Sequence, residues 1–247
     1  MDEHFQTRVH VVDKKTGEIC KQKFITDPLF LFHHINAYEK RDSENNLTEI
    51  VCDICAYDPK YFDINGLSYA DMFSDEKLGA KLFDATARRI TIPFGPKNEE
   101  ANESDTIFCE IKDLNPKVSF ELPAINYSRF NGKSYKYFYG SSYNQKPFSI
   151  IKVNVENPTE IWRKNYDQDG KQYLPSEPVF VESPNPTSED DGVLLVMVLS
   201  DKIDFLSILV AKNLNEIAQA VVPEGVLGAF TFHGFFADTK KFKSLND

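Results

Sequence analysis

The sequence predicts an all-β protein, because short apolar segments recur along the chain with turn residues between most of them. Runs such as EIVCDICAY (49–57), GVLLVMVL (192–199) and FLSILVA (205–211) are rich in β-branched and apolar residues. Aromatic residues make up 13% of the chain, and their flat side chains pack well on pleated sheets. An internal repeat is the third observation, and it indicates which β architectures are possible.

The repeat consists of an alternating strand, a polar turn, and a Glu-Ile pair that opens a second strand. Its three copies are VHVVDKKTGEICKQ (9–22), IKVNVENPTEIWRK (151–164) and ILVAKNLNEIAQAV (208–221). If one unit takes roughly 40–55 residues, as a propeller blade does, the copies lie about three units and one unit apart. The repeat leaves a β-propeller and a β-sandwich equally open. It also predicts a β-hairpin at KNLNEIAQA (212–220), which looks helical by itself.

Two segments interrupt the β pattern. Residues 66–83, GLSYADMFSDEKLGAKLF, place apolar residues near a 3.6-residue period and predict a helix. Residues 95–105, GPKNEEANESD, are acidic and turn-rich and predict a solvated loop. SEDDG (188–192) is also acidic, and a solvated turn is the stronger interpretation there than a cation site.

Charge and hydropathy exclude some classes of function. The formal net charge is −10 at pH 7, whereas a nucleic-acid-binding protein normally carries a basic surface. No apolar run reaches the roughly 18–20 residues that span a bilayer, and the first ten residues lack an apolar signal-peptide core. We therefore expect an intracellular protein, cytoplasmic or mitochondrial, that is not secreted and binds no nucleic acid.

The four cysteines of the chain do not form a disulfide framework for a protein of this length. Cys52 and Cys55 form a C-x-x-C motif, but a structural zinc site needs four ligands and no second pair is present. We expect two buried thiols on one strand.

Candidate metal ligands come from the five histidines. His33 lies in PLFLFHHINAYE and His233 in AFTFHGFF, so both sit in apolar, aromatic runs. Burial keeps an imidazole neutral, which is the state that binds a metal. Taken singly, each residue is more often a core histidine than a ligand. His34 follows His33 directly, and in an extended strand its side chain would point to the opposite face.

Two glutamates have a similar apolar context. Glu121 lies in VSFELPAIN and Glu177 in YLPSEPVFV. A buried carboxylate needs a partner, and one solution is to accept the N–H of a metal-bound imidazole, which fixes the orientation of the ring. The alternative is that each glutamate accepts backbone amides at a bulge or turn. From the residues alone, both interpretations stay open.

Four ordered motifs resemble those of animal carotenoid cleavage oxygenases, a family that includes β-carotene-cleaving enzymes and the retinoid isomerohydrolase. They are FHHINAYE (32–39), FELPAINYSRFNGKSYKYFYG (120–140), YLPSEPVFVESPNPTSEDDGVLLVMVLS (173–200) and TFHGFF (231–236). The resemblance covers essentially the whole chain. It implies a seven-bladed β-propeller, of which residues 1–247 would form a single partial domain of about three to four blades.

The resemblance also implies the chemistry. The family binds iron(II) with four histidines, and second-shell glutamates orient three of them. His33 and His233 match two of the ligands, Glu121 and Glu177 match glutamates that serve them, and His34 is not expected to bind metal. The implied reaction adds dioxygen across one carbon–carbon double bond of an apolar carotenoid or apocarotenoid.

The chain departs from the family in length. Family members are roughly twice as long, and their N-terminal half supplies the other two histidines and the membrane-docking surface. We therefore expect the C-terminal half of such an enzyme, inactive alone, with membrane contact only through the missing half. Two other hypotheses are a non-enzymatic propeller fragment that binds a partner or an apolar ligand, and a retinoid ester isomerohydrolase.

Overall fold

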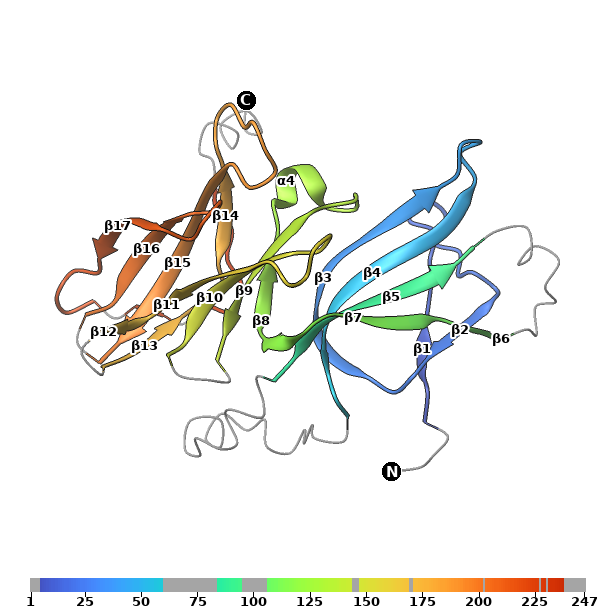
Figure 1. Ribbon diagram of the computed structural model, residues 1–247, viewed down its shortest axis with the longest axis horizontal. Helices are drawn as coiled ribbons and strands as arrows, with labels where there is room; N and C mark the ends of the chain where they lie inside the picture. Colours follow the sequence, from blue (N-terminus) through green and yellow to red (C-terminus); the bar gives the residue numbers. More distant parts are fainter. Residues whose placement is uncertain are drawn as a thin grey trace. The chain divides into compact units, whose positions relative to one another are not determined.

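The computed structural model describes residues 5–59, 84–94, 106–143, 147–168, 171–201, 203–226, 228–229 and 231–237 (Figure 1). The predicted helix at 66–83 and the predicted loop at 95–105 lie outside these residues. The chain forms two compact units. Unit 1 comprises Met1–Glu121 and Phe130–Tyr135, and unit 2 comprises Leu122–Arg129 and Lys136–Asp247.

The described residues of unit 1 form two sheets. The larger is antiparallel, and its strands follow one another in the order β3 (Phe30–Arg41), β4 (Leu47–Tyr57), β5 (Thr86–Pro93) and β7 (Glu110–Ser119). The smaller contains β1 (Thr7–Val9), β2 (Lys23–Thr26) and β6 (Thr106–Phe108), with β2 and β6 parallel. Neighbouring strands of the larger sheet can be followed side by side in Figure 1.

Alternation along β4 separates an apolar side from a side that carries polar groups. Ile54, Ala56 and Cys52 pack with the core cluster that contains Phe24 and Ile90. Odd-numbered positions of the strand point the other way. Because the two residues of the C-x-x-C motif lie on opposite sides of one regular strand, they cannot share a metal ion. All four cysteines are free thiols, and Cys52 and Cys55 both lie on β4. Cys55 is buried whereas Cys52 is only partly buried, so the expectation of two buried thiols is confirmed for Cys55 alone.

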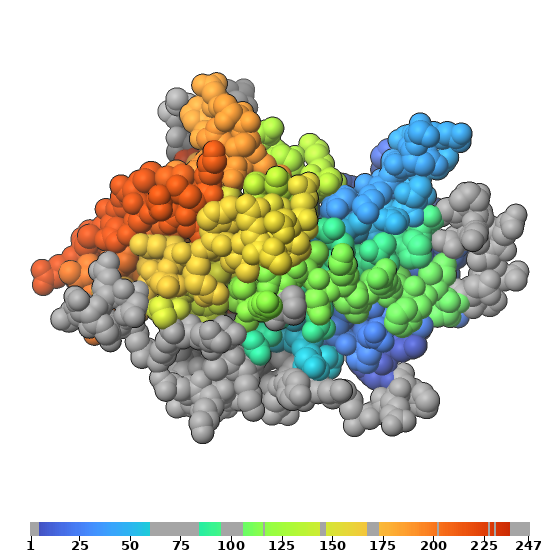
Figure 2. All heavy atoms as spheres, viewed as in Figure 1, coloured from blue at the N-terminus to red at the C-terminus, as the bar shows by residue number. Residues whose placement is uncertain are grey.

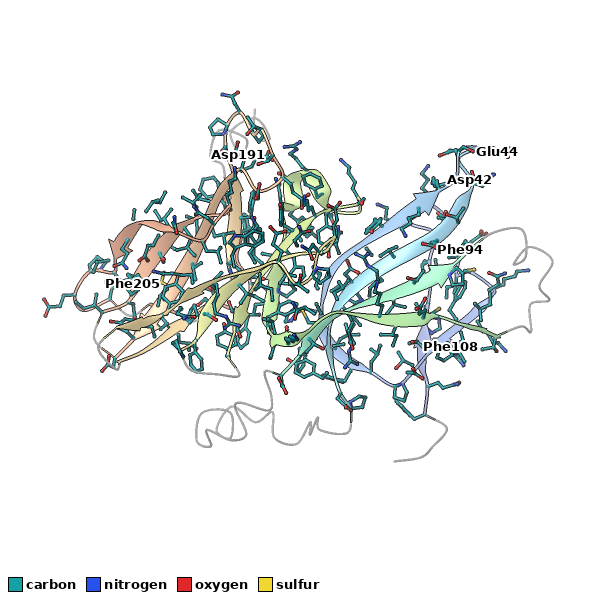
Figure 3. All side chains as sticks on the ribbon, in the orientation of Figure 1. Asp42, Glu44, Phe94, Phe108, Asp191 and Phe205 are labelled. Atoms are coloured by element: carbon teal, nitrogen blue, oxygen red, sulfur yellow. The ribbon has the colours of Figure 1, made fainter. Side chains whose placement is uncertain are left out.

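The β3–β4 hairpin ends in a turn that Asp42 closes. Its carboxylate accepts the backbone N–H groups of Glu44 at 2.9 Å and Asn46 at 2.8 Å. Asn45 takes a positive φ of 68°, a conformation that asparagine tolerates better than most residues. Figure 3 shows Asp42 and Glu44 at this tip, which projects into solvent as blue spheres in Figure 2.

Unit 2 also contains two sheets. The first has the order β11 (Ile161–Asn165), β10 (Ser149–Asn154), β9 (Tyr137–Ser142) and β8 (Glu121–Ala124), and a short helix, α4 (Tyr127–Phe130), follows β8. The second runs β12 (Asp167–Gln168), β13 (Lys171–Pro175), β15 (Gly192–Ser200), β16 (Phe205–Val210) and β17 (Glu216–Val221), while β14 (Val179–Glu182) also pairs with β15. Leu194, Val196 and Val198 alternate on β15 and are fully buried in the core. The prediction of an all-β chain is confirmed.

The internal repeat corresponds to hairpins. In the second copy β10 pairs with β11, and in the third β16 pairs with β17, which begins at Glu216. The strand predicted at KNLNEIAQA is therefore confirmed. The first copy is closed by an isolated bridge between Val12 and Ile19, so its pairing is shorter.

The prediction of a solvated turn at SEDDG is wrong for Asp190, which is 5% exposed. Asp190 lies 2.6 Å from the ammonium of Lys152 on β10, which is itself fully buried. Glu189 accepts the backbone N–H groups of Lys136 and Tyr137 at 2.9 and 2.8 Å. Asp191, labelled in Figure 3, accepts from Thr187. Asp190 is thus buried against Lys152, whereas Ser188 is exposed and Glu189 and Asp191 are partly exposed.

Gly192 begins β15 in a space that excludes a side chain. A Cβ atom there would meet the Val181 carbonyl oxygen at 2.4 Å and Phe180 Cζ at 2.9 Å. We expect Gly192→Ala to lower the free energy of unfolding by about 1–3 kcal/mol, because backbone would have to shift. Urea unfolding measures this loss, and an unchanged midpoint would contradict the close approach.

Candidate functional site

His33 lies on β3 where its pairing with β4 is interrupted. Leu31 pairs with Ala56, His34 with Ile54 and Asn36 with Asp53, so β3 has an extra residue on each side of His34. Bulges of this kind bend a strand and change the direction of its side chains, and they are common beside active sites. The bulged segment carries His33.

The imidazole of His33 is held by Glu121. Nδ1 of His33 lies 2.6 Å from Oε2 of Glu121, whose side chain is 3% exposed. A carboxylate can only accept, so Nδ1 carries the proton and donates it. The other carboxylate oxygen, Oε1, accepts the hydroxyl of Tyr57 at 2.6 Å. Glu121 therefore bridges a tyrosine at the end of β4 and a histidine on β3.

The groups around Glu121 are kept protonated. Burial, followed by the charge of Glu121, raises the pKa of Tyr57 well above its usual range. The same two causes raise the pKa of the Cys55 thiol. Tyr57 consequently remains a hydrogen-bond donor at any physiological pH.

Aromatic rings surround this end of the strands. Tyr57 makes edge contacts with Phe32 at 5.6 Å and with Phe30 at 6.0 Å between ring centroids. The Phe32 centroid lies 6.4 Å from that of His33. His34 is exposed, whereas His33 is partly buried, so the two adjacent histidines have different environments.

A second histidine–glutamate pair lies in unit 2. Nδ1 of His233 is 3.1 Å from Oε1 of Glu177, and the backbone N–H of Gly234 donates to Oε2 at 2.7 Å. The backbone N–H of Thr231 donates to Ser176 Oγ at 3.2 Å, and the backbone N–H of Glu177 donates to the Thr231 carbonyl oxygen at 3.4 Å. Glu177 therefore does what both sequence interpretations suggested, since it accepts an imidazole and a backbone amide. The His233 side chain is 65% exposed, so the burial expected from its aromatic context is wrong for this histidine, whose neighbours Phe232 and Phe235 are exposed as well.

The two pairs share one chemical feature. In each pair, the carboxylate accepts a hydrogen bond from Nδ1–H. When such a ring is neutral, its lone pair is on Nε2, and this tautomer can bind a metal through Nε2. His33 and Glu121 belong to unit 1, and His233 and Glu177 to unit 2. Within the described residues, no three His, Cys, Asp or Glu side chains gather closely enough to hold a metal ion. Metal binding by the two histidines stays a prediction.

Comparison with known proteins identifies the family. The family model described as RPE65, retinal pigment epithelial membrane protein, matches residues 1–238. The chain belongs to the carotenoid oxygenase family. The chain is 33% identical to the mitochondrial carotenoid-cleaving dioxygenase of Mustela putorius furo, over 94% of this chain and 46% of that protein. It is 32% identical to the Homo sapiens protein of the same name, over 93% of this chain and 42% of that protein. The chain spans less than half the length of these relatives.

Solved structures show the carotenoid oxygenase fold. A variant of the Synechocystis apocarotenoid oxygenase matches with a TM-score of 0.64 and 23% identity, over 88% of this chain and 41% of that one. The cobalt-substituted form of the same oxygenase matches with a TM-score of 0.63 and 21% identity, over the same shares. The predicted fold class, an all-β part of a β-propeller, is confirmed, which decides against the sandwich.

Tyr57 is the site residue that the sequence analysis missed. It closes the apolar run EIVCDICAY, where a buried tyrosine hydroxyl needs a partner. That requirement was the available signal. The partner itself, Glu121, lies 64 positions further along the chain, so its identity depends on the fold. Among the described residues, no helix is long and apolar enough to cross a membrane.

Proposed function

We propose that the chain supplies part of a non-haem iron(II) site that cleaves a carbon–carbon double bond of carotenoids or apocarotenoids to two carbonyl products. The observation that carries this proposal is the pair of imidazoles, His33 and His233, each held at Nδ1 by a carboxylate. Relatives named as carotenoid-cleaving dioxygenases, and a structural neighbour that holds cobalt, support it.

The donor set fits iron(II). Two neutral imidazoles bring no charge to the metal, and imidazole nitrogen is a common ligand of iron. His33 and His233 would bind through Nε2, while Glu121 and Glu177 fix the tautomer and orientation of each ring. The remaining ligands would come from the part of the relatives that this chain does not span. Iron(II), when bound, would supply the redox centre that activates dioxygen.

The residues beside His33 suit an apolar substrate. Phe30, Phe32 and Tyr57 form a cluster of edge-packed rings next to the imidazole. Such a surface would hold a polyene by contact and exclude water from the reacting bond. The substrates in this proposal are therefore the polyene and dioxygen, with no nucleic acid. Membrane contact would come from the part that is not spanned.

The location of the protein is proposed on the same basis. Three of the relatives carry the word mitochondrial in their names. We propose an intracellular location, in mitochondria or the cytoplasm, and imaging of a tagged version in its own cells tests it.

The iron content of the purified chain tests the incomplete site. We expect less than one tightly held iron per chain, because two imidazoles alone do not complete the coordination of the metal. We define the ferret hybrid as this chain joined to the part of the Mustela putorius furo (ferret) relative that the match does not cover. This ferret hybrid should hold about one iron and cleave β-carotene to apocarotenals. Inductively coupled plasma mass spectrometry measures the metal, and chromatography identifies the products.

Each outcome separates the hypotheses. Stoichiometric tight iron on the chain alone would contradict the incomplete site. A hybrid that binds an apolar ligand without iron would support the non-enzymatic alternative. A hybrid that holds iron and converts retinyl esters but leaves carotenoids intact would support the isomerohydrolase.

A further inference from the structure

Tyr57 occupies a defined place in the hydrogen-bond chain of unit 1. Its hydroxyl donates to Oε1 of Glu121 at 2.6 Å, and Oε2 of the same carboxylate accepts Nδ1–H of His33 at 2.6 Å. We propose that Tyr57 is a positioning residue, which fixes the Glu121 carboxylate so that His33 keeps its proton on Nδ1 and offers Nε2. This inference rests on the proposed function for its consequence at the metal.

The terminal torsion of a glutamate is broad, so a carboxylate with a single partner can rotate. Glu121 has a donor on each oxygen, which fixes the plane of the group. The side chain is 3% exposed, so water cannot take over the role of the tyrosine.

Tyr57 is 3% exposed, and its ring packs at 86° against Phe32 and at 60° against Phe30. Ring packing therefore fixes the position of the hydroxyl before it meets Glu121. A rigid donor transmits orientation, whereas a mobile donor would only add a hydrogen bond.

A neutral imidazole carries its proton on either nitrogen, and the group that accepts from one nitrogen decides which. A correctly oriented carboxylate at Nδ1 leaves the lone pair on Nε2. If Glu121 turns, the Nε2–H tautomer gains population, and that tautomer cannot bind a metal through Nε2.

Unit 1 contains a matched control for this arrangement. The hydroxyl of Tyr135 donates to Oδ2 of Asp53 at 2.7 Å in a buried pair. Asp53 lies on β4 as Tyr57 does, but Arg89 also holds its carboxylate, at 2.7 and 2.8 Å. Tyr135→Phe thus removes a buried hydroxyl from a carboxylate in the same unit, without touching the Glu121–His33 pair.

The test is to measure the tautomer of His33 in the chain without added metal. Histidine ¹⁵N shifts, recorded at a pH where the ring is neutral, give the ratio of Nδ1–H to Nε2–H. We expect this ratio to fall about two- to tenfold in Tyr57→Phe, the range for loss of one hydrogen bond, and to stay unchanged in Tyr135→Phe. Circular dichroism checks that both variants are folded.

Two results would overturn the proposal. One is an unchanged ratio in Tyr57→Phe, and the other is an equal fall in both variants, which would show a general loosening. If Tyr57→Phe does not fold, the test is made on the unaltered chain by proton NMR. The proposal requires that the Tyr57 hydroxyl proton exchange slowly with solvent. Its detection would support the role, and its absence would refute it.

The tautomer measurement is independent of the proposed function. If the ferret hybrid binds no metal but the ratio still falls in Tyr57→Phe, the iron proposal fails and the positioning role stands. If the hybrid binds metal, Tyr57→Phe should weaken its Co(II) affinity by about tenfold. If the hybrid binds metal and Tyr57→Phe changes neither the Co(II) affinity nor the tautomer ratio, the positioning role is refuted and the iron proposal stands.

Discussion

Replacing His33 with alanine is expected to lower the metal affinity of the ferret hybrid by more than about 100-fold, because a ligand is lost outright. His233→Ala should have the same effect. Deleting an imidazole leaves the metal with an open position and leaves Glu121 or Glu177 without its ring partner. Competition against a chromogenic chelator, with Co(II) in place of iron, gives the dissociation constant directly.

The matched control for His33 is its neighbour. His34 is exposed, and the extra residues in β3 give it a different environment from that of His33. We expect His34→Ala to leave Co(II) affinity within about twofold of the unaltered hybrid, because an exposed side chain that is not a ligand contributes little. Equal losses in the two variants would show that the motif, rather than the single ring, matters. Retained affinity in His33→Ala would remove it from the ligand set.

The largest effect on stability is expected at Lys152. Its ammonium lies 2.6 Å from Asp190 and 2.8 Å from the carbonyl oxygen of Lys212. It also lies 4.0 Å from the ring centroid of Tyr137 and 4.5 Å from that of Trp162. Burial lowers the pKa of Lys152, and its contacts with Asp190 oppose that shift. The lysine thus ties β10 to the acidic turn before β15.

We expect Lys152→Met to lower the free energy of unfolding by about 3–5 kcal/mol, because Asp190 would keep a buried charge without its partner. Adding Asp190→Leu should recover much of the loss, since that charge is then removed as well. Urea unfolding measures each variant.

The control for the lysine is an exposed ion pair. Lys40 and Glu49 lie 2.9 Å apart on the β3–β4 hairpin, and their side chains are 50% and 36% exposed. Lys40→Met should cost less than about 1 kcal/mol. If Lys40→Met and Lys152→Met lower the free energy of unfolding by similar amounts, burial of the Lys152–Asp190 pair does not determine its effect on stability.

The two histidine–glutamate pairs could be predicted from the sequence. Tyr57, which donates to Glu121, and the bulges beside His33 could not. An apolar context identified all four side chains, and the motif resemblance paired them. Tyr57 was missed, because only the fold brings the end of β4 to the start of β8. The bulges around His33 were missed for a related reason, since pairing with β4 defines them and FHHINAYE contains no glycine or proline.

The acidic turn shows the opposite error. SEDDG looks solvated because three carboxylates adjoin a glycine, and a local pattern cannot reveal that Lys152 lies against Asp190. The repeat succeeded where local propensity failed. KNLNEIAQA resembles a helix alone, but comparison with two other copies of the pattern predicted the strand that begins at Glu216.

The most direct test of the account is a crystal structure of the ferret hybrid loaded with iron(II), with anomalous diffraction at the iron edge. We expect one anomalous peak within coordination distance of Nε2 of both His33 and His233, with Nδ1 of each ring hydrogen-bonded to Glu121 and Glu177 respectively. A peak that neither ring reaches, or a ring that meets the metal through Nδ1, would contradict it.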